Sequence, residues 1–218
     1  MATGPRVLLV AKRPLAERLG PTDSQRLVLE PRIGLDALLA AAASHAAVLA
    51  RIVADLSDVP VREKVVDQLD AHDADQADLI VTVGGDGTVF AVNALRATRP
   101  VITVNSDPSR SVGHFTRCTV EGFRALFAAW QAGTTRVEPI SRLQVTSGDG
   151  DGVPHRILND CLFTSRNPAA ITRYVLDADG SSERQQSSGV WIATAAGSTA
   201  AIRSAGLEPP LAPGQEAL

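Results

Sequence analysis

The sequence predicts an α/β domain with a parallel sheet, followed by a second domain built of β-strands. Up to residue 135, short apolar runs alternate with helix-like segments, a pattern typical of a parallel sheet covered by helices on both faces. One such run, Leu79–Val83, ends in two glycines, which indicates a strand, a tight turn and a helix N-terminus. From Arg136 onward, β-like runs are separated by Gly, Asp and Ser. We therefore expect one domain over residues 1–135 and another over residues 136–218.

The composition is that of an ordinary globular protein. The chain has 218 residues, of which 44% are hydrophobic and 21% are charged, enough for a sizeable core. Its formal net charge of −3 gives no reason to expect nucleic acid or a membrane surface as a partner. No apolar run reaches the roughly 18 residues of a membrane span. Cys118 and Cys161 lack metal-ligand spacing and are expected to be free thiols. Because no signal pattern opens the chain, we expect a cytoplasmic protein.

Hydrophobic periodicity sets the expected elements of the first domain. The segment 35–56 is rich in Ala and Leu at helical spacing, and the segment 61–69 is amphipathic and follows Pro60. Residues 13–31 carry prolines and polar residues, which favours a loop. Strands are expected over 6–10, 79–83 and 100–104, and helices over 35–56, 61–69, 89–96 and 120–132.

In the second domain, strands are expected over 137–145, 156–165, 171–176 and 190–194. The last segment, 208–218, is proline-rich and weakly patterned. We therefore expect the second domain to be incomplete.

The run Gly84-Gly85-Asp86-Gly87-Thr88 is the first candidate site. Its glycines allow a sharp turn and a close approach by a ligand, and the following helix N-terminus favours phosphate. Asp86 would repel a phosphate unless a metal or a proton transfer uses its carboxylate, which makes it the candidate catalytic residue. The alternative is a glycine-rich turn in which Asp86 caps the helix.

Two further motifs carry polar groups in apolar surroundings. Asn159-Asp160 lies in a strand-like run, where its oxygens can accept hydrogen bonds from ribose hydroxyls; the alternative is a β-bulge or turn. Gly197-Ser198-Thr199-Ala200 follows a strand and opens a helix, which indicates a second phosphate or ribose contact or, alternatively, ordinary capping. His114 lies in the loop after the third strand, and no histidine has metal-ligand spacing, so we assign no metal-ligating residue.

In their order and spacing, these three motifs resemble those of the NAD kinases. The branch of plant NADH kinases and mitochondrial-type enzymes is the most similar, through Val104-Asn105-Ser106-Asp107-Pro108 and Ser187-Ser188-Gly189. The resemblance implies a Rossmann-like first domain and a β-sandwich second domain. It also implies transfer of the γ-phosphoryl group of ATP, with Mg²⁺, to the adenosine 2′-hydroxyl of NAD or NADH, in a homodimer or a higher homo-oligomer.

The resemblance also implies roles for single residues. Asp86 would activate the hydroxyl or help hold Mg²⁺, and the remaining residues would bind the nucleotides. The implied cofactor-binding residues are Gly84, Gly85, Gly87, Thr88, Asn105, Asn159, Asp160, Gly197, Ser198, Thr199 and Ala200.

The chain departs from the wider family at Ser188, where many bacterial members have an acidic residue, and at Ala201, where they have a Tyr. Relatives also continue well beyond Gly206. The resembled branch also lacks the acidic residue and the Tyr, so these two departures are features of the subgroup. Two rival functions stay open. One is a non-catalytic dinucleotide-binding or assembly module, and the other is a lipid or sugar kinase that shares the glycine turn.

Overall fold

A computed structural model describes residues 4–18, 34–96, 98–146, 148, 152–167, 169–208, 211 and 216–217. The chain forms two compact units, Met1–Glu138 and Pro139–Leu218, divided three residues after the expected boundary.

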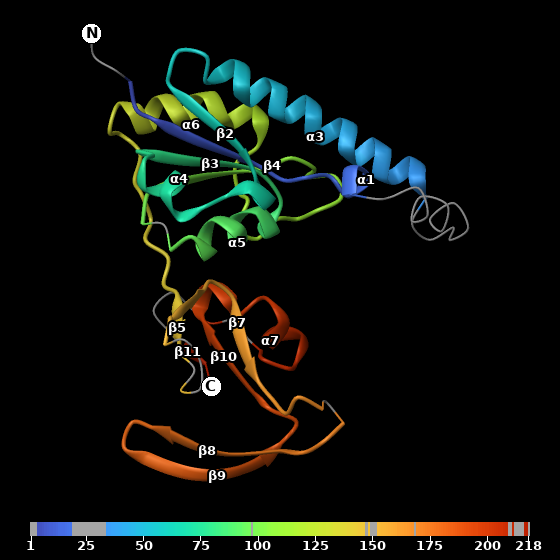
Figure 1. The fold of residues 1–218 in the computed structure, drawn as a ribbon, viewed down its shortest axis with the longest axis vertical. Coiled ribbons are helices and arrows are strands. Elements are labelled where there is room, and N and C mark those ends of the chain that lie inside the picture. The colour runs from blue at the N-terminus through green and yellow to red at the C-terminus, as the bar shows by residue number, and fades with distance from the viewer. Residues whose placement is uncertain are drawn as a thin grey trace. The chain divides into compact units, whose positions relative to one another are not determined.

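The first unit is built on a four-stranded parallel sheet (Figure 1), which confirms the predicted α/β domain. The strand order is β2-β1-β3-β4, so the chain leaves β1 toward one neighbour and later returns on its other side. In the register, Leu9 lies between Glu63 and Val81. The strands are β1 Val7–Ala11, β2 Val61–Val65, β3 Leu79–Gly84 and β4 Val101–Asn105.

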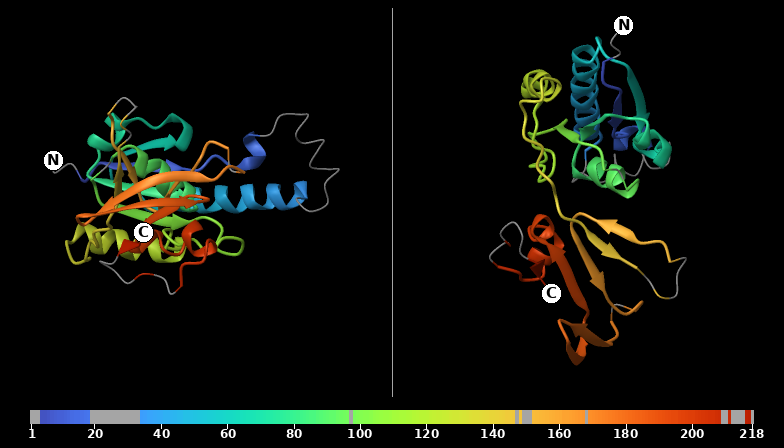
Figure 2. Two further views of the ribbon diagram at one scale, coloured as in Figure 1. Left: turned by 90° about the horizontal axis from the view of Figure 1, so that it is seen from below. Right: turned by 90° about the vertical axis from the view of Figure 1, so that its left-hand side faces the viewer.

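Helices cover both faces of this sheet, as the views in Figures 1 and 2 show. Helices α3 and α6 pack on one face and α4 and α5 on the other. The described helices are α1 Leu15–Arg18, α3 Leu35–Asp55, α4 Ala71–Asp75, α5 Asp86–Ala94 and α6 Val120–Gln131, with a 3₁₀ turn, η1, at Val66–Gln68.

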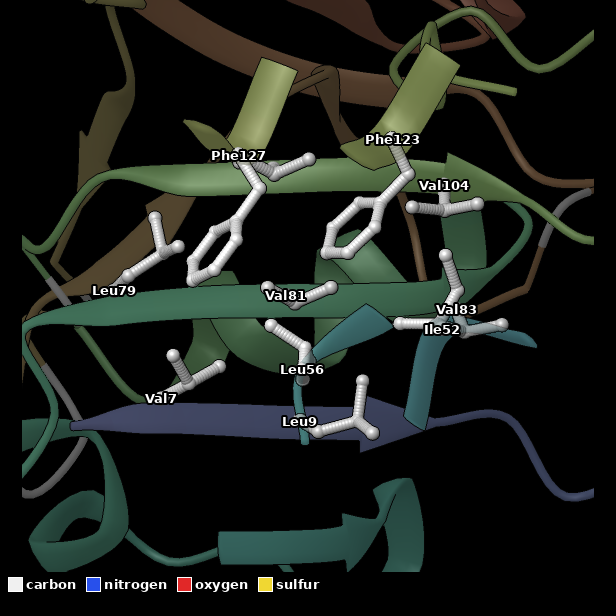
Figure 3. Close-up of a cluster of buried hydrophobic side chains, with 11 residues drawn as sticks. Val7, Leu9, Ile52, Leu56, Leu79, Val81, Val83, Val104, Phe123 and Phe127 are labelled. Atoms are coloured by element: carbon white, nitrogen blue, oxygen red, sulfur yellow. The ribbon is translucent and has the colours of Figure 1, made fainter. Parts of the chain in front are cut away.

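The core follows the two-residue alternation of a strand. Alternate residues of β1 and β3 face α3 and α6, where Ile52, Phe123 and Phe127 close the layer (Figure 3). The rings of Phe123 and Phe127 stack with their centroids 5.8 Å apart. The other residues of the same strands pack on α4 and α5. Because both faces are covered, β1 and β3 are buried along their whole length.

Helix α3 differs from the expectation that no segment is long and apolar enough for a membrane span. Its 21 residues are long and apolar enough, by length and composition alone, to span a membrane. Its C-terminal half is a core helix, since Ile52 is fully buried against the sheet and Leu56, which caps the helix, is buried beside it.

The predicted helix over 61–69 is wrong. The chain instead forms the edge strand β2, which pairs with β1, and then the turn η1. The charged residues that suggested an amphipathic helix are those of an exposed sheet edge. Arg62 and Lys64 pair there with the buried carboxylate of Asp73 at 2.7 and 3.3 Å.

The second unit contains only antiparallel pairs among its described strands, which agrees with the predicted β texture. Strand β10 pairs with β7 and with β11, while β5–β6 and β8–β9 are separate hairpins, of which β8–β9 is the long ribbon in Figure 1. The strands are β5 Leu143–Val145, β6 His155–Ile157, β7 Asp160–Phe163, β8 Thr172–Ala178, β9 Ser181–Ser187, β10 Val190–Thr194 and β11 Glu216–Ala217.

Four expectations for this unit need correction. The expected strand 156–165 is two strands, β6 and β7, which are separated by Leu158 and Asn159. The run 137–145 is a strand only over β5, and β9 was not expected to be a strand. The weakly patterned segment 208–218 also contributes β11, which pairs with β10. Residues 209–210 and 212–215 of that segment lie outside the described residues, as do residues 19–33 of the expected loop.

Candidate functional site

A pocket of about 430 Å³ lies at the carboxyl ends of the parallel strands. Lys12 follows β1, Gly84 ends β3 and Asn105 ends β4, and all three line the pocket. Strands β1 and β3 are neighbours whose connections leave in opposite directions. This is the switch point at which open α/β sheets bind their ligands.

The glycine turn between β3 and α5 forms one wall of this pocket. A Cβ at Gly84 would overlap the hydroxyl of Thr88 and lie 3.2 Å from the Cβ of Lys12. The Gly84 carbonyl also accepts a hydrogen bond from the N–H of Ser106 at 3.0 Å. Gly84 is therefore required by packing.

Gly87 differs from Gly84, because nothing lies within 4 Å of the position that its Cβ would take. It is exposed in the first turn of α5 and lines the pocket. Glycine at this position leaves the helix N-terminus open, which is compatible with the expected approach of an anion.

Asp86 lies in the same turn, but its carboxylate is turned to the loop that follows β4. The backbone N–H of Phe115 and that of Thr116 donate to Oδ1 at 2.9 and 3.1 Å, and the Thr116 hydroxyl donates to the same oxygen. The N–H of His114 donates to Oδ2 at 2.8 Å. Gly85, not Asp86, occupies the N-cap of α5, so the helix-capping alternative is not what the structure shows. Asp86 instead ties two loops of the site together.

Asn105 organises the same loop from its other end. Its side-chain amide donates to the Ser111 carbonyl at 2.9 Å, and its Oδ1 accepts from the N–H of Asp107 at 3.0 Å. Gly113 has φ +63°, and a Cβ there would overlap Thr116 and crowd the Asn105 amide. The buried Asn105 therefore fixes the loop that Asp86 holds.

The positive charges of the pocket lie outside the three sequence motifs. Lys12 and Arg13 follow β1 directly, and both line the pocket. Arg13 pairs with Asp67 at 3.1 Å. Burial lowers the pKa of Lys12, and attraction to Asp107 opposes this shift. In the sequence, these two residues are visible as a basic pair at the end of the first strand. That this pair lies beside β3 depends on the strand order, which the sequence pattern does not give.

Asp107 is the other buried charge at this wall. Burial raises its pKa, but hydrogen bonds from Ser109 and Arg110, with the attraction of Arg110 and Lys12, outweigh burial and keep the pKa below its ordinary value. The carboxylate therefore stays ionised and helps hold the local charge balance.

In the second unit, the pairing of β7 with β10 brings the other two motifs together. Asn159 comes directly before β7, and Gly197 ends the 3₁₀ turn η2, Ala195–Gly197, directly after β10. A Cβ at Gly197 would overlap the backbone carbonyl of Asn159. The glycine is therefore required by close backbone contact. The Asn159 Oδ1 is buried and, among the described residues, has no hydrogen-bond partner.

The remaining residues of these motifs form local contacts. Asp160 accepts a hydrogen bond at 2.6 Å from the N–H of Ile202, at the start of the short helix α7, Ala201–Ser204. The Ser198 hydroxyl donates to the Ala195 carbonyl and accepts from the N–H of Leu211. Thr199 and Ala200 follow in the turn before α7 and are half-buried. Asp160 and Ser198 thus hold the turn that carries the third motif.

No group of three or more potential metal-ligating side chains occurs in the described part of the chain. A magnesium ion that travels with a nucleotide needs few protein ligands, because phosphates and water complete its shell. The pocket offers an open helix N-terminus at Gly87 and the cations Lys12 and Arg13, which fit a phosphate chain carrying such an ion.

The sheet order and the pocket define the first unit as an open parallel α/β protein with a ligand site at its switch point. Residues 37–133 match the family model of the ATP-NAD kinase N-terminal domain. The chain belongs to the NAD kinase family, which confirms the resemblance seen in its motifs.

Two plant proteins are among the most similar relatives. A protein of Oryza sativa subsp. japonica named "Probable NADH kinase" is 34% identical over 157 residues, which cover 62% of this chain and 47% of that protein. The NADH kinase of Arabidopsis thaliana is 31% identical over 174 residues, which cover 69% of this chain and 55% of that protein. The chain thus spans about half the length of these relatives.

The crystal structure of yeast NADH kinase complexed with NADH has the same fold, with a TM-score of 0.60 and 17% identity. The match covers 97% of this chain and 64% of the yeast protein. The fold is therefore NAD kinase-like across both units.

Proposed function

We propose that the protein is an NAD(H) kinase, which transfers the γ-phosphoryl group of ATP to the adenosine 2′-hydroxyl of NAD or NADH. The observation that carries the proposal is the Gly84–Thr88 turn at the switch-point pocket, in a chain that contains the NAD kinase domain. Phosphoryl transfer requires mainly positioning and charge neutralisation, and this pocket offers both. The plant relatives named NADH kinase support the choice of substrate class.

In this proposal, the N-terminus of α5 holds the phosphates of ATP through the backbone at Gly85 and Gly87. The N–H of Thr88 donates to the Gly85 carbonyl at 2.9 Å and stabilises this turn. Bound with ATP, Mg²⁺ would supply further neutralisation of the phosphate charge. Asp86 is the candidate group that accepts the proton of the ribose hydroxyl. Its Oδ2 accepts one hydrogen bond, from His114, whereas Oδ1 accepts three, so Oδ2 is the oxygen with a lone pair to spare.

The second unit supplies the proposed dinucleotide contacts. The Oδ1 of Asn159, which has no hydrogen-bond partner among the described residues, is suited to a ribose hydroxyl, and the turn at Gly197 lies directly against this residue. The antiparallel strands support a β-sandwich as the architecture of this unit. The homo-oligomeric state and the cytoplasmic location stay predictions from the sequence.

The proposal is tested with the full chain, ATP, Mg²⁺ and either NAD or NADH, scored for NADP or NADPH. Asp86→Asn is the test variant and Asp58→Asn, at an exposed turn after α3, is its matched control. We expect turnover in the wild type and in Asp58→Asn, and a large loss in Asp86→Asn. Dinucleotide binding by calorimetry without any turnover would contradict the kinase and support the binding module. Phosphorylation of a lipid or sugar in place of the dinucleotide would favour the other rival.

A further inference from the structure

Lys12 has an unusual place in this chain. Lys12 and Lys64 are its only lysines, whereas arginine supplies every other basic side chain apart from the four histidines. Lys64 pairs with Asp73 at 3.3 Å, at the sheet edge. Lys12 lies at the centre of the sheet, directly after β1, where its N–H donates to the Val83 carbonyl at 3.0 Å. This bond holds the residue beside the glycine turn.

Within the described part of the chain, the ammonium group of Lys12 has no close counter-charge. Among the described residues, no carboxylate lies within 4.0 Å of it, whereas Arg13, Arg110 and Lys64 each have one within 3.3 Å. Asp107 exerts a longer-range attraction on Lys12, and burial disfavours its charged form. A half-buried cation that lines a pocket and is disfavoured by burial is the kind of group that gains most from an anionic ligand.

A second, independent feature of the same pocket points to a ligand. Ser106 follows β4 and is fully buried, and its hydroxyl has no hydrogen-bond partner among the described residues. Its N–H and its carbonyl are both engaged, with the Gly84 carbonyl and the Ser44 hydroxyl. Because buried hydroxyls are nearly always paired, this orphan hydroxyl on the pocket wall fits a ligand oxygen.

His45 is a buried neighbour of Lys12 on α3. Burial, followed by the nearby Lys12 charge, lowers the pKa of the imidazole to about 4, so the ring is neutral near pH 7. It therefore adds no second positive charge beside Lys12.

We propose that Lys12 binds the terminal phosphates of the donor nucleotide, with the Ser106 hydroxyl as a second contact. This inference rests on the proposed function and adds a residue that none of the three sequence motifs contains. Lysine acts here as a point charge beside the glycine turn, where negative charge spreads over the transferred phosphoryl group. Lys12 forms no covalent bond in the reaction; it binds the phosphates and neutralises part of their negative charge.

The presence of only two lysines permits a chemical test that does not depend on turnover. Pyridoxal 5′-phosphate condenses with a free lysine amine, releasing water, and borohydride then reduces the imine to a stable secondary amine. Peptide mass spectrometry separates the labels on Lys12, on Lys64 and on the N-terminal amine. We expect both ATP and inorganic tripolyphosphate to slow labelling of Lys12 at least roughly 10-fold and to leave Lys64 unchanged, because only Lys12 lines the pocket.

Substitutions supply a second readout. Lys12→Met keeps the length of the side chain and removes its charge, Lys12→Arg keeps the charge, and Lys64→Met is the matched control. We expect Lys12→Met to raise the KM for ATP roughly 10- to 100-fold, with a smaller change in the KM for the dinucleotide, because one charged contact to phosphate is lost. Lys12→Arg should restore part of the ATP affinity. Circular dichroism and urea unfolding would show whether each variant folds.

The outcomes separate this inference from the proposed function. If ATP binds and NADP(H) is formed but Lys12 is labelled equally fast with and without ATP, the Lys12 inference is overturned and the kinase stands. If tripolyphosphate protects Lys12 but no NADP(H) is formed, the anion site is supported and the kinase is contradicted. If neither ATP nor tripolyphosphate protects Lys12 and the wild type forms no NADP(H), both are overturned.

Discussion

The carboxylate of Asp86 and residue Thr116 are joined twice, since the Thr116 N–H and its hydroxyl both donate to the same carboxylate oxygen, at 3.1 and 3.3 Å. The residue expected to perform chemistry is therefore also a structural link between the turn after β3 and the loop after β4. With the N–H groups of His114 and Phe115, four donors converge on one side chain. Asp86 thus holds a loop of its own site in place.

This link predicts that Asp86→Asn damages the loop as well as turnover. The new amide places an N–H donor opposite one of the backbone donors, so at least one hydrogen bond is lost and the free energy of unfolding falls by about 1–3 kcal/mol. Hydrogen exchange should be faster at the amides of residues 114–116. Unchanged exchange there would mean that the loop is held by other contacts, and Asp58→Asn serves as the control.

Gly87 provides a test in which stability and binding move in opposite directions. Gly87→Ala meets no atom within 4 Å and replaces a glycine inside a helix, so it should raise the free energy of unfolding by about 0.5–1 kcal/mol. The added methyl group would nonetheless stand where phosphate is expected to approach. We predict weaker ATP binding by calorimetry in a more stable protein. Unchanged ATP affinity would place the phosphates elsewhere.

Gly197 tests the contact between the two motifs of the second unit. Gly197→Ala forces a methyl group into the Asn159 carbonyl, and we expect a loss of about 1–3 kcal/mol in the free energy of unfolding. Gly148→Ala is the matched control, since nothing lies within 4 Å of that position. Urea denaturation followed by circular dichroism measures both variants. Equal stabilities would show that the turn relaxes without cost.

His45 predicts a specific dependence of stability on pH. Burial, followed by the Lys12 charge, lowers its pKa from 6.5 to about 4, so the unfolded chain binds a proton more readily than the folded one. Stability is therefore complete above pH 6.5 and falls as the pH is lowered toward 4. The free energy of unfolding that is lost over this pH range through His45 is on the order of 2 kcal/mol.

The measurement is urea unfolding at pH 7 and pH 4.5 for the wild type, for His45→Gln and for His72→Gln, an exposed control. The wild type and His72→Gln should lose this stability on acidification, whereas His45→Gln should lose less. An equal loss in all three proteins would exclude His45 as the cause.

The parallel sheet was predictable because burial on both faces leaves a clear mark in the sequence. The apolar runs of β1, β3 and β4 and the helices α3 and α6 lie where periodicity placed them, within a residue or two. Strand β2 was not predictable from local pattern. Its charged edge residues have helical propensity, and pairing with β1 overrides that propensity.

Strand β9 was missed because its residues are polar, yet a usable signal preceded it. Asp179 and Gly180 both have positive φ, as a two-residue hairpin turn requires, and Asp-Gly is a preferred pair for such a turn. β11 was missed because it is only two residues long and depends on its pairing with β10.

For the candidate site, the sequence predicted the turns that carry the motifs but not the residues that surround these turns in the fold. The Gly84–Thr88 turn, Asn105, the Asn159–Asp160 pair and the Gly197 turn all lie at ends of strands, where the residues themselves carry the pattern. Lys12 and Ser106 join the pocket only through the strand order. The contacts of Asp86 with residues 114–116 likewise depend on a long-range fold that no local pattern encodes.

The identity of the reaction product shows whether the protein is an NAD(H) kinase. The full chain would be incubated with ATP, Mg²⁺ and NADH or NAD, and the dinucleotide analysed by ³¹P NMR and mass spectrometry. We predict one added phosphate, as a monoester on the adenosine 2′-oxygen, and almost none with Asp86→Asn. A dinucleotide recovered unchanged, while binding to the folded protein is measurable, would contradict it.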